Sequence, residues 1–419
     1  MSETQQFEPL APVVQRFLQY VAMDTQSAEG AENYPSTEKQ KILGKVLVDE
    51  LLGLGLADAS MNDFGIVTAT LQASPGVEAP TIGFIAHMDT SPDVSGNDVR
   101  PIIHSNYQGG PIVLPEGNVT IDPAASPQLN GCIGHDLITA DGRTLLGADD
   151  KAGIAEIITA FEWLLEHPEC KHGTVRLAFT CDEEVGRGTL HFDVAAFGAI
   201  CAYTVDGESA GEVENETFCA DLATLKISGR NVHPGYAKDK LLSALKGGAA
   251  VISGLHANEA PETTEKRQGY LHPIHFSGGV EEATLRVLVR DFEEAGLERL
   301  EATLEGVVSV VKSSFPGLGI ETTIMKQYRN MRPLLEDLPA LTDYAMEAVR
   351  RAGGEPRLSY ARGGTDGAML TFKGLPCPNL FAGGHNFHSK REWISVQDME
   401  LAVRTIVELA ILWGDHPAK

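Results

Sequence analysis

The 419-residue chain lacks any uninterrupted apolar stretch long enough to cross a membrane, so we expect no membrane-spanning segment. It has six cysteines, which are widely separated and lack the paired spacing of a thiolate metal site. Scattered cysteines within apolar runs are typical of free thiols in a reducing compartment. Residues 1–12 lack the basic and apolar regions of a secretion signal. These absences predict a cytoplasmic protein.

Positive charge is also scarce, with 33 Lys and Arg against 58 Asp and Glu and a formal net charge of −25. Such a field repels phosphate backbones, so nucleic acid is a poor candidate partner. The excess of carboxylates favours solubility, and it also offers oxygen ligands for cations. The hydrophobic fraction of 43% is that of a globular protein. The length favours two or three domains over a single core.

Three short apolar runs, each followed by acidic or histidine residues, predict buried strands with functional ends. The runs are residues 81–86, 175–180 and 199–205. Helices are predicted over residues 15–21, 38–52 and 152–166, the last with one apolar stripe and Asp150 capping its start. Alternating strands and helices indicate an α/β fold with a mostly parallel sheet. In such sheets, ligands bind at the carboxyl ends of the strands.

A different pattern follows from about residue 218 to residue 328. It predicts a strand at 222–228, a helix at 239–256, strands at 274–277 and 283–292, a helix at 293–313 and a strand at 320–326. This β-α-β-β-α-β order is that of a ferredoxin-like α+β unit. We therefore predict a catalytic domain in two parts, residues 1–216 and 329–419, with an inserted lid domain at residues 217–328.

Seven acidic and histidine residues are candidates for a metal site: His87, Asp89, Asp149, Glu183, Glu184, Asp206 and His388. His87 and Asp89 are two apart at a strand end, so both point to one side of extended chain. Taken singly, each of the seven is more often a structural or surface residue. Their recurrence at several strand ends of one sheet favours a site that binds cations.

Two imidazoles and three carboxylates without clustered thiols suit a pair of Zn²⁺ ions, with Mn²⁺ or Co²⁺ as alternatives. A carboxylate bridging two metals leaves room for a bridging hydroxide, and the pair can also polarise a scissile carbonyl. A further carboxylate is then required as general base, to carry a proton from the water to the leaving amine. This chemistry is hydrolysis of an amide or peptide bond.

Several longer motifs resemble the M20 family of metallopeptidases. They lie at residues 83–91, 145–155, 180–188, 203–207, 231–235, 362–367, 386–388 and 392–393, so the resemblance runs almost end to end. It implies a catalytic domain of the zinc exopeptidase type with an inserted lid. One departure, Ser389-Lys390-Arg391 after His388, puts the fine shape of the subsite for the substrate's C-terminus in doubt.

The resemblance also implies a role for each residue of the metal site. Asp149 would bridge the two ions, with His87 and Asp206 completing one shell and Glu184 and His388 the other. Glu183 would be the general base, and Asp89 would orient His87. The peptide bond between Asp149 and Asp150 would be cis.

Other residues of the family motifs would bind the substrate. His233 would polarise the scissile carbonyl, and Arg290 and Arg362 would hold the peptide backbone or the C-terminal carboxylate. Asn231 and Lys390 are weaker candidates for the same pocket. From pattern alone, His233 is equally a plain loop histidine, and each arginine is more often a surface residue.

The implied activity is an aminopeptidase that releases the first residue of tripeptides. A related dipeptidase or N-acyl amino acid deacylase needs the same metals, and a metal-free binding protein on a retired enzyme fold is a third alternative. Relatives also use the inserted domain for dimerisation, so a homodimer through this domain is a further expectation.

Overall fold

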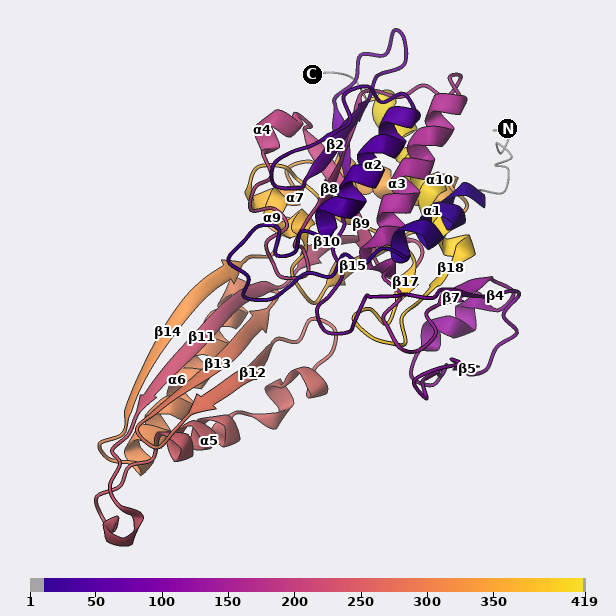
Figure 1. Cartoon of the computed structure of the whole chain (residues 1–419). Helices are drawn as coiled ribbons and strands as arrows, with labels where there is room; N and C mark the ends of the chain where they lie inside the picture. The colour runs from indigo at the N-terminus through magenta and orange to yellow at the C-terminus, as the bar shows by residue number, and fades with distance from the viewer. Residues whose placement is uncertain (1–10, 417–419) are drawn as a thin grey trace. The chain divides into compact units, whose positions relative to one another are not determined.

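A computed structural model describes residues 11–416 of the chain. Most of residues 1–12, which we predicted to lack the features of a secretion signal, lies outside the described residues. The described chain forms two compact units (Figure 1). Unit 1 contains residues 1–215, 333–360 and 365–419, and unit 2 contains residues 216–332 and 361–364. Within residues 11–416, every helix is too short or too polar to cross a bilayer.

An eight-stranded sheet forms the centre of unit 1, in the order β1-β2-β8-β3-β9-β16-β10-β15. Its four middle strands, β8, β3, β9 and β16, run parallel, and β2 and β10 flank them antiparallel. The strands are β1 Ser60–Met61, β2 Val67–Leu71, β3 Ile82–His87, β8 Val175–Thr180, β9 Cys201–Gly207, β10 Glu212–Thr217, β15 Arg357–Ala361 and β16 Asn379–Phe381. Because the middle strands are parallel, their carboxyl ends meet at one edge of the sheet.

Helices cover this sheet on both faces, which explains why its middle strands read as continuous apolar runs. On one face α3 (Ala148–Glu166) contacts β3 and β9, and α1 (Ala11–Val21) and α10 (Val396–Gly414) pack on α3 (Figure 1). On the other, Ile85 and Ala202 pack with side chains of α4 (Val194–Phe197) and α9 (Asp366–Phe372). The remaining helices of unit 1 are α2 (Gln40–Gly53) and α8 (Ala340–Arg351), with α7 (Arg332–Leu335) at the boundary.

Two smaller sheets lie in the same unit. One has the order β17-β18-β7-β4, from Gly384–His385, Trp393–Ser395, Leu137–Thr139 and Ile102–His104. The other pairs β5 (Ile112–Val113) with β6 (Thr120–Ile121), and the 3₁₀ helix η1 (Pro127–Cys132) follows. Trp393, Leu137 and Tyr107 belong to the apolar cluster of this region. The small sheet thus joins the segment before Asp149 to the segment that carries His388.

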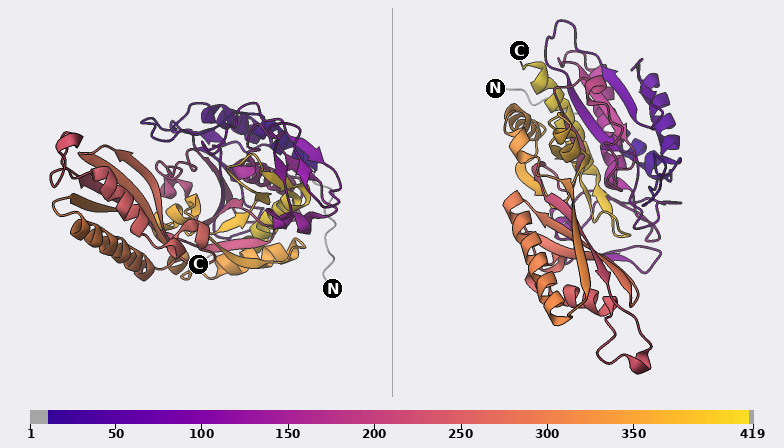
Figure 2. Two further views of the ribbon diagram at one scale, coloured as in Figure 1. Left: turned by 90° about the horizontal axis from the view of Figure 1, so that it is seen from below. Right: turned by 90° about the vertical axis from the view of Figure 1, so that its left-hand side faces the viewer.

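Unit 2 is a four-stranded antiparallel sheet in the order β12-β13-β11-β14. Its elements are β11 Cys219–Ser228, α5 Ala244–Gly254, β12 Tyr270–Gly278, β13 Glu282–Asp291, α6 Glu294–Ser314 and β14 Gly319–Tyr328, with short 3₁₀ turns η2 (Pro234–Tyr236), η3 (Ala257–Glu259) and η4 (Pro261–Thr263). Alternate residues of β11 and β13 pack with α5 and α6, which therefore share one face of the sheet (Figure 2). The β-α-β-β-α-β order is ferredoxin-like.

The predicted fold class is confirmed, because a mostly parallel α/β sheet is combined with a ferredoxin-like unit. Two predicted helix starts were wrong. The helix expected from Gln15 begins at Ala11. The helix expected from Asp239 begins at Ala244, because Asp239 has a positive φ of 62° and Ser243 caps the helix by accepting from the Lys246 amide. Unit 2 also includes residues 361–364, whereas the sequence pattern assigned them to the catalytic domain.

Helix α3 approaches β9 most closely at Gly153, where a Cβ atom would meet the carbonyl oxygen of Val205 and the carboxylate of Asp150. Replacing Gly153 by Ala forces the helix away from the strand, which we expect to destabilise the protein by about 1–3 kcal/mol. Denaturant unfolding of the purified variant measures this loss.

The matched control is Gly53→Ala, in helix α2 of the same unit, where no atom would meet the added Cβ. This control should be neutral or slightly stabilising, because alanine lowers the entropy of the unfolded chain. Equal stabilities of the two variants would contradict the close helix-strand approach.

Candidate metal centre

His87 is the last residue of β3, and contacts at both of its ring nitrogens hold the ring in place. Its Nδ1 atom lies 3.0 Å from the backbone oxygen of Asp89 and 3.5 Å from the Asp89 carboxylate. Its Nε2 atom faces Asp149 at 2.8 Å and Asp206, near the end of β9, at 3.5 Å. The ring is 3% exposed, so these partners replace most of its contact with water. One imidazole nitrogen is thus oriented by Asp89 while the other faces two carboxylates.

Asp149 lies in a tight turn at the start of α3, where the backbone is not helical. The buried carboxylate of Glu392 accepts hydrogen bonds from the backbone N–H groups of Leu146, Gly147 and Asp149 at 2.6, 2.9 and 3.1 Å. The peptide bond between Asp149 and Asp150 is cis, as the family resemblance implied. Glu392 therefore sets the turn from which the Asp149 side chain projects.

The two oxygens of Asp149 face different histidines. Oδ1 lies 2.8 Å from Nε2 of His87, and Oδ2 lies 3.1 Å from Nε2 of His388. His388 Nε2 also lies 2.8 Å from the carboxylate of Glu184. Asp149 therefore stands between a His87–Asp206 pair and a His388–Glu184 pair. This is the arrangement expected of a carboxylate that two cations share.

Glu183 and Glu184 lie in the turn after β8. The buried carboxylates of two other residues fix this turn by accepting hydrogen bonds. Asp89 accepts from the backbone N–H of Glu183 at 3.0 Å and from that of Glu184 at 3.2 Å. Asp182, which has a positive φ of 62°, accepts from the Ser36 amide and from the Gln40 side chain at 2.7 Å each. The backbone before both glutamates is therefore fixed without using their own side chains.

His388 lies in the loop after β17 and has a positive φ of 57°. Its neighbour Asn386 bonds the Ser126 hydroxyl and donates to the Arg391 backbone oxygen at 3.1 Å, which closes the loop. The ring is more exposed than that of His87, and its Nδ1 atom lies 3.6 Å from Asp93. The structure thus brings His87, Asp89, Asp149, Glu184, Asp206 and His388 together, with Glu183 on the same turn as Glu184.

Asp150 offers an alternative ligand. One of its carboxylate oxygens lies within 4.8 Å of a ring nitrogen of His87 and of a carboxylate oxygen of Asp206. However, its Oδ2 atom accepts from the backbone N–H of His87 at 3.2 Å, and its Oδ1 atom accepts from that of Gly153 at 3.1 Å. The second bond caps α3, as the sequence predicted. Asp150 therefore uses both oxygens to join β3 to the start of the helix.

The electrostatics of the group reflect a surplus of carboxylates. Burial raises the pKa of Glu184 to about 8, that of Asp206 to about 6 and that of Glu183 well above its ordinary value. Burial alone would lower the pKa of His388, but its bonds to Asp149 and Glu184 raise it to about 11. Negative charge in this volume is therefore costly unless cations offset it.

The donor set fits cations of the zinc type. Imidazole nitrogens and carboxylate oxygens suit Zn²⁺, Mn²⁺ and Co²⁺, and none of the described cysteines joins this group. Oε1 of Glu184 is buried and has no hydrogen-bond partner among the described residues. A carboxylate oxygen left unpaired in this way is a suitable ligand atom.

Two predicted substrate residues, Asn231 and His233, are exposed on unit 2. His233 precedes η2, and its Nδ1 atom accepts from the backbone N–H of Gly235 at 3.1 Å. Its ring lies 5.3 Å from that of Tyr236. This bond engages Nδ1 and does not involve Nε2. Lys390, the weaker candidate, is exposed on unit 1.

The two predicted arginines also belong to unit 2. Arg290, at the end of β13, is 8% exposed and donates to the backbone oxygens of Asp221 and Val289 at 3.1 and 3.0 Å. Arg362 donates to the backbone oxygens of Lys266 and Gln268 and to the Thr264 hydroxyl. Its guanidinium also lies over the Phe218 ring at 5.1 Å. These contacts explain why residues 361–364 belong to unit 2.

Sequence reasoning missed the residues that position the ligands, namely Glu392, Asp182 and Asp366. Asp366 is buried, accepts from the Thr180 hydroxyl at 2.8 Å, and has a pKa that burial raises to about 7. All three lie within motifs that carried the family resemblance, but their roles depend on partners far away in the sequence. An acidic residue directly before an apolar run, as in Glu392-Trp393-Ile394, was the available signal.

The chain is similar to known proteins over most of its length. Residues 139–411 match the model of the peptidase family M20/M25/M40. The chain is 47% identical over 404 residues to the peptidase T of Bacillus pumilus, which covers 96% of this chain and 98% of that protein.

Two solved structures share the fold. The aminopeptidase PepT of Bacillus cereus has a TM-score of 0.73 at 23% identity, covering 96% of this chain and 98% of that one. A tripeptidase of Staphylococcus aureus has a TM-score of 0.75 at 22% identity, covering 97% and 98%. The family model matches more than half of this chain, and the peptidase T of Bacillus pumilus is 47% identical to it. The chain therefore belongs to the M20/M25/M40 family of peptidases.

Proposed function

We propose that the chain is a dinuclear, metal-dependent aminopeptidase that releases the N-terminal residue of tripeptides. The main support is the position of the Asp149 carboxylate, one oxygen of which faces His87 and the other His388. Its relatives include a protein named peptidase T, and one structural neighbour is a tripeptidase. The six cysteines are buried and free, which supports a reducing, cytoplasmic location.

We assign His87 and Asp206 to one metal ion, Glu184 and His388 to the other, and Asp149 to both. Two Zn²⁺ ions held there would polarise a peptide carbonyl and lower the pKa of water. Mn²⁺ and Co²⁺ suit the same nitrogen and oxygen ligands. Asp89 serves as a positioning residue, because its carboxylate contacts the His87 ring and holds the backbone of both glutamates.

Glu183 is the residue we assign to proton transfer. Burial raises the pKa of Glu183 well above its ordinary value, which makes its carboxylate a stronger base. The proton would leave the attacking water, rest on the Glu183 carboxylate, and pass to the nitrogen of the leaving amine. Glu184, one residue later, has its carboxylate 2.8 Å from His388 and is thereby committed to a different role.

Substrate recognition is assigned to unit 2. His233 would polarise the scissile carbonyl, with Asn231 as a weaker contact. Arg290 and Arg362 would hold the peptide backbone and the C-terminal carboxylate, which sets the length of peptide accepted. A homodimer through this unit stays a prediction.

The nearest alternative is a dipeptidase or an N-acyl amino acid deacylase with the same metals. The relatives favour the tripeptide activity, and the metal ligands alone do not separate the three. A panel of dipeptides, tripeptides, tetrapeptides and acylated amino acids does, and we expect tripeptides to have the highest kcat/KM. Preference for acylated amino acids would overturn the aminopeptidase assignment.

Replacing Glu183 by Gln removes the proton acceptor while preserving its shape. We expect kcat for a tripeptide to fall about 10²–10⁴-fold, with the metal content of the wild type unchanged. Steady-state kinetics and elemental analysis measure the two quantities. Glu169→Gln, at an exposed glutamate, is the matched control and should retain full activity. Turnover at the wild-type rate in Glu183→Gln would remove this residue from the mechanism.

Replacing His388 by Ala removes a ligand from one of the two proposed shells. We expect metal content after dialysis to fall by one ion per chain relative to the wild type, because His87, Asp149 and Asp206 retain the other shell. Elemental analysis by mass spectrometry reports the count directly. His256→Ala, at an exposed histidine of unit 2, should keep the wild-type metal content. A wild-type metal content in His388→Ala would show that His388 is not a ligand.

Arg290→Met tests the recognition of the peptide's C-terminus. We expect KM for a tripeptide to rise about 10–100-fold, which corresponds to the loss of one or two charge-assisted hydrogen bonds. A tripeptide amide, which has no carboxylate, should be affected much less. The control is Arg286→Met, an exposed arginine on the same strand. Equal losses for acid and amide would assign Arg290 a purely structural role.

A further inference from the structure

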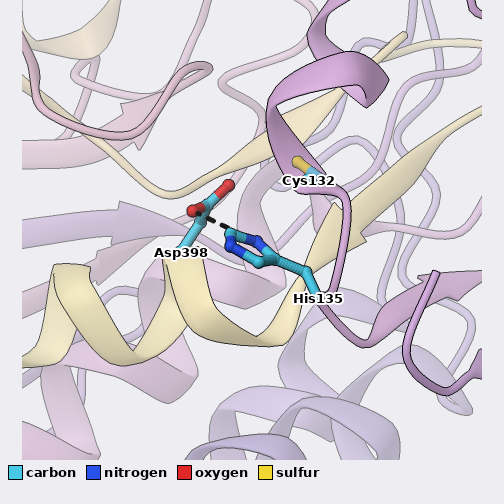
Figure 3. A group of neighbouring side chains, drawn as sticks. All are labelled: Cys132, His135 and Asp398. Atoms are coloured by element: carbon cyan, nitrogen blue, oxygen red, sulfur yellow. Dashed lines mark ion pairs between the residues drawn. The ribbon is translucent and has the colours of Figure 1, made fainter. Parts of the chain in front are cut away.

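A second group of metal-ligating side chains lies in unit 1 outside the centre described above. It consists of Cys132, at the end of η1, His135, three residues later, and Asp398, in the first turn of α10 (Figure 3). One potential ligand atom from each residue lies within 4.8 Å of the others. Figure 3 shows the His135 ring turned toward the Asp398 carboxylate, and their nearest atoms are 4.0 Å apart.

Local structure brings Cys132 and His135 together. The backbone N–H of His135 donates to the Cys132 carbonyl at 2.9 Å, which closes a tight turn over Ile133 and Gly134. Gly134 has a φ of 92°, a conformation that favours glycine. The turn is tied to Tyr107 by two backbone hydrogen bonds of 2.7 Å. The turn thus brings the two side chains of the Cys-x-x-His motif close together, as in many thiolate metal sites.

Other hydrogen bonds tie this turn to the helix that carries Asp398. The Val396 amide donates to the Asp136 carbonyl at 2.9 Å, and the Asp136 amide donates to the side chain of Gln397 at 2.9 Å. Ser395 caps α10 by accepting from the Asp398 amide at 3.2 Å, and its hydroxyl also lies 2.9 Å from Nδ1 of His135. The three potential ligands are therefore positioned before any ion binds.

We propose that Cys132, His135 and Asp398 bind a third divalent cation of the zinc class, separate from the dinuclear centre. Thiolate, imidazole and carboxylate together suit Zn²⁺ or Co²⁺ rather than Mg²⁺ or Ca²⁺. Tetrahedral zinc has metal-ligand distances of about 2.0–2.3 Å, which places its ligand atoms about 3.5 Å apart. The three ligand atoms, which lie within 4.8 Å of one another, would have to move closer together to reach this spacing, after which water can fill the fourth position.

Charge in the surrounding core agrees with a bound cation. Glu156, in α3, is fully buried, and both oxygens of its carboxylate have no hydrogen-bond partner among the described residues. Besides burial, the charge of Asp398 raises the pKa of Glu156, so the two carboxylates repel each other. A dication on Asp398 would offset this repulsion.

The ordinary alternative is that Cys132 is simply a core residue. It does pack in the apolar cluster with Leu129 and Trp393. That packing accounts for the burial of the thiol, but it does not require an imidazole and a carboxylate beside it. Burial raises the pKa of the Cys132 thiol to about 12, which disfavours the thiolate that a nucleophile requires. A coordinated cation, by contrast, deprotonates a thiol directly.

Cobalt substitution of the full-length protein tests the proposal without measuring catalysis. A cobalt ion bound by a thiolate gives a charge-transfer band in the near ultraviolet, and the proposed dinuclear centre has no sulfur ligand. We expect chelated wild-type protein titrated with Co²⁺ to develop this band with a stoichiometry of one ion per chain. A folded wild-type protein without the band would overturn the proposal.

Variants then identify the ligands. Cys132→Ser should abolish the band and lower total metal content from three ions to two, and Asp398→Asn should weaken binding at least 10-fold. Cys219→Ser, a buried cysteine of unit 2, is the matched control and should keep both the band and three ions. A band that survives Cys132→Ser would overturn the proposal. Because none of these readings depends on peptide hydrolysis, they remain valid if the proposed activity is wrong.

Discussion

The orientation of one carboxylate, that of Asp149, determines the geometry of the whole candidate centre. Three backbone N–H groups around it donate to the buried Glu392, which lies more than two hundred residues later in the chain. The turn is therefore set by a second carboxylate whose own charge is costly to bury, since burial raises the pKa of Glu392 to about 7. If this turn moved, neither histidine would keep its present distance to Asp149.

Other buried carboxylates around the site also fix the backbone by accepting hydrogen bonds. Asp89 holds the turn of the two glutamates, Asp182 joins that turn to residues 36–40, and Asp150 joins β3 to α3. Each of these carboxylates accepts hydrogen bonds from backbone N–H groups, which offset part of the desolvation cost. The strong negative charge of the chain thus has a structural component as well as a contribution to solubility. Acidic side chains position the groups that are placed to bind cations.

Much of the fold was predictable because its signals are local. Apolar runs ending in His87, Asp206 and the Glu183–Glu184 pair marked parallel strands, and the switch of pattern near residue 218 marked the ferredoxin-like unit. The start of α5 was mispredicted because Leu241 and Leu242, just before Ser243, continue a helical spacing that the positive φ of Asp239 interrupts. Glu392 and Asp182 escaped prediction for a different reason, since their hydrogen-bond partners lie far away in sequence, and no local pattern encodes such pairs.

Asp149 and Asp150 show most clearly why residue type alone does not assign a role. The two are adjacent and chemically identical, and both lie close to His87. Asp150 is directed at backbone N–H groups on either side, so its oxygens are already satisfied and its charge is suppressed by burial. Asp149 instead faces two imidazoles, which lower its pKa despite its burial and keep it ionised. The two aspartates therefore differ in role because the backbone directs their side chains differently, and not because their chemistry differs. Asp149 is placed to bind cations, whereas Asp150 stabilises the fold.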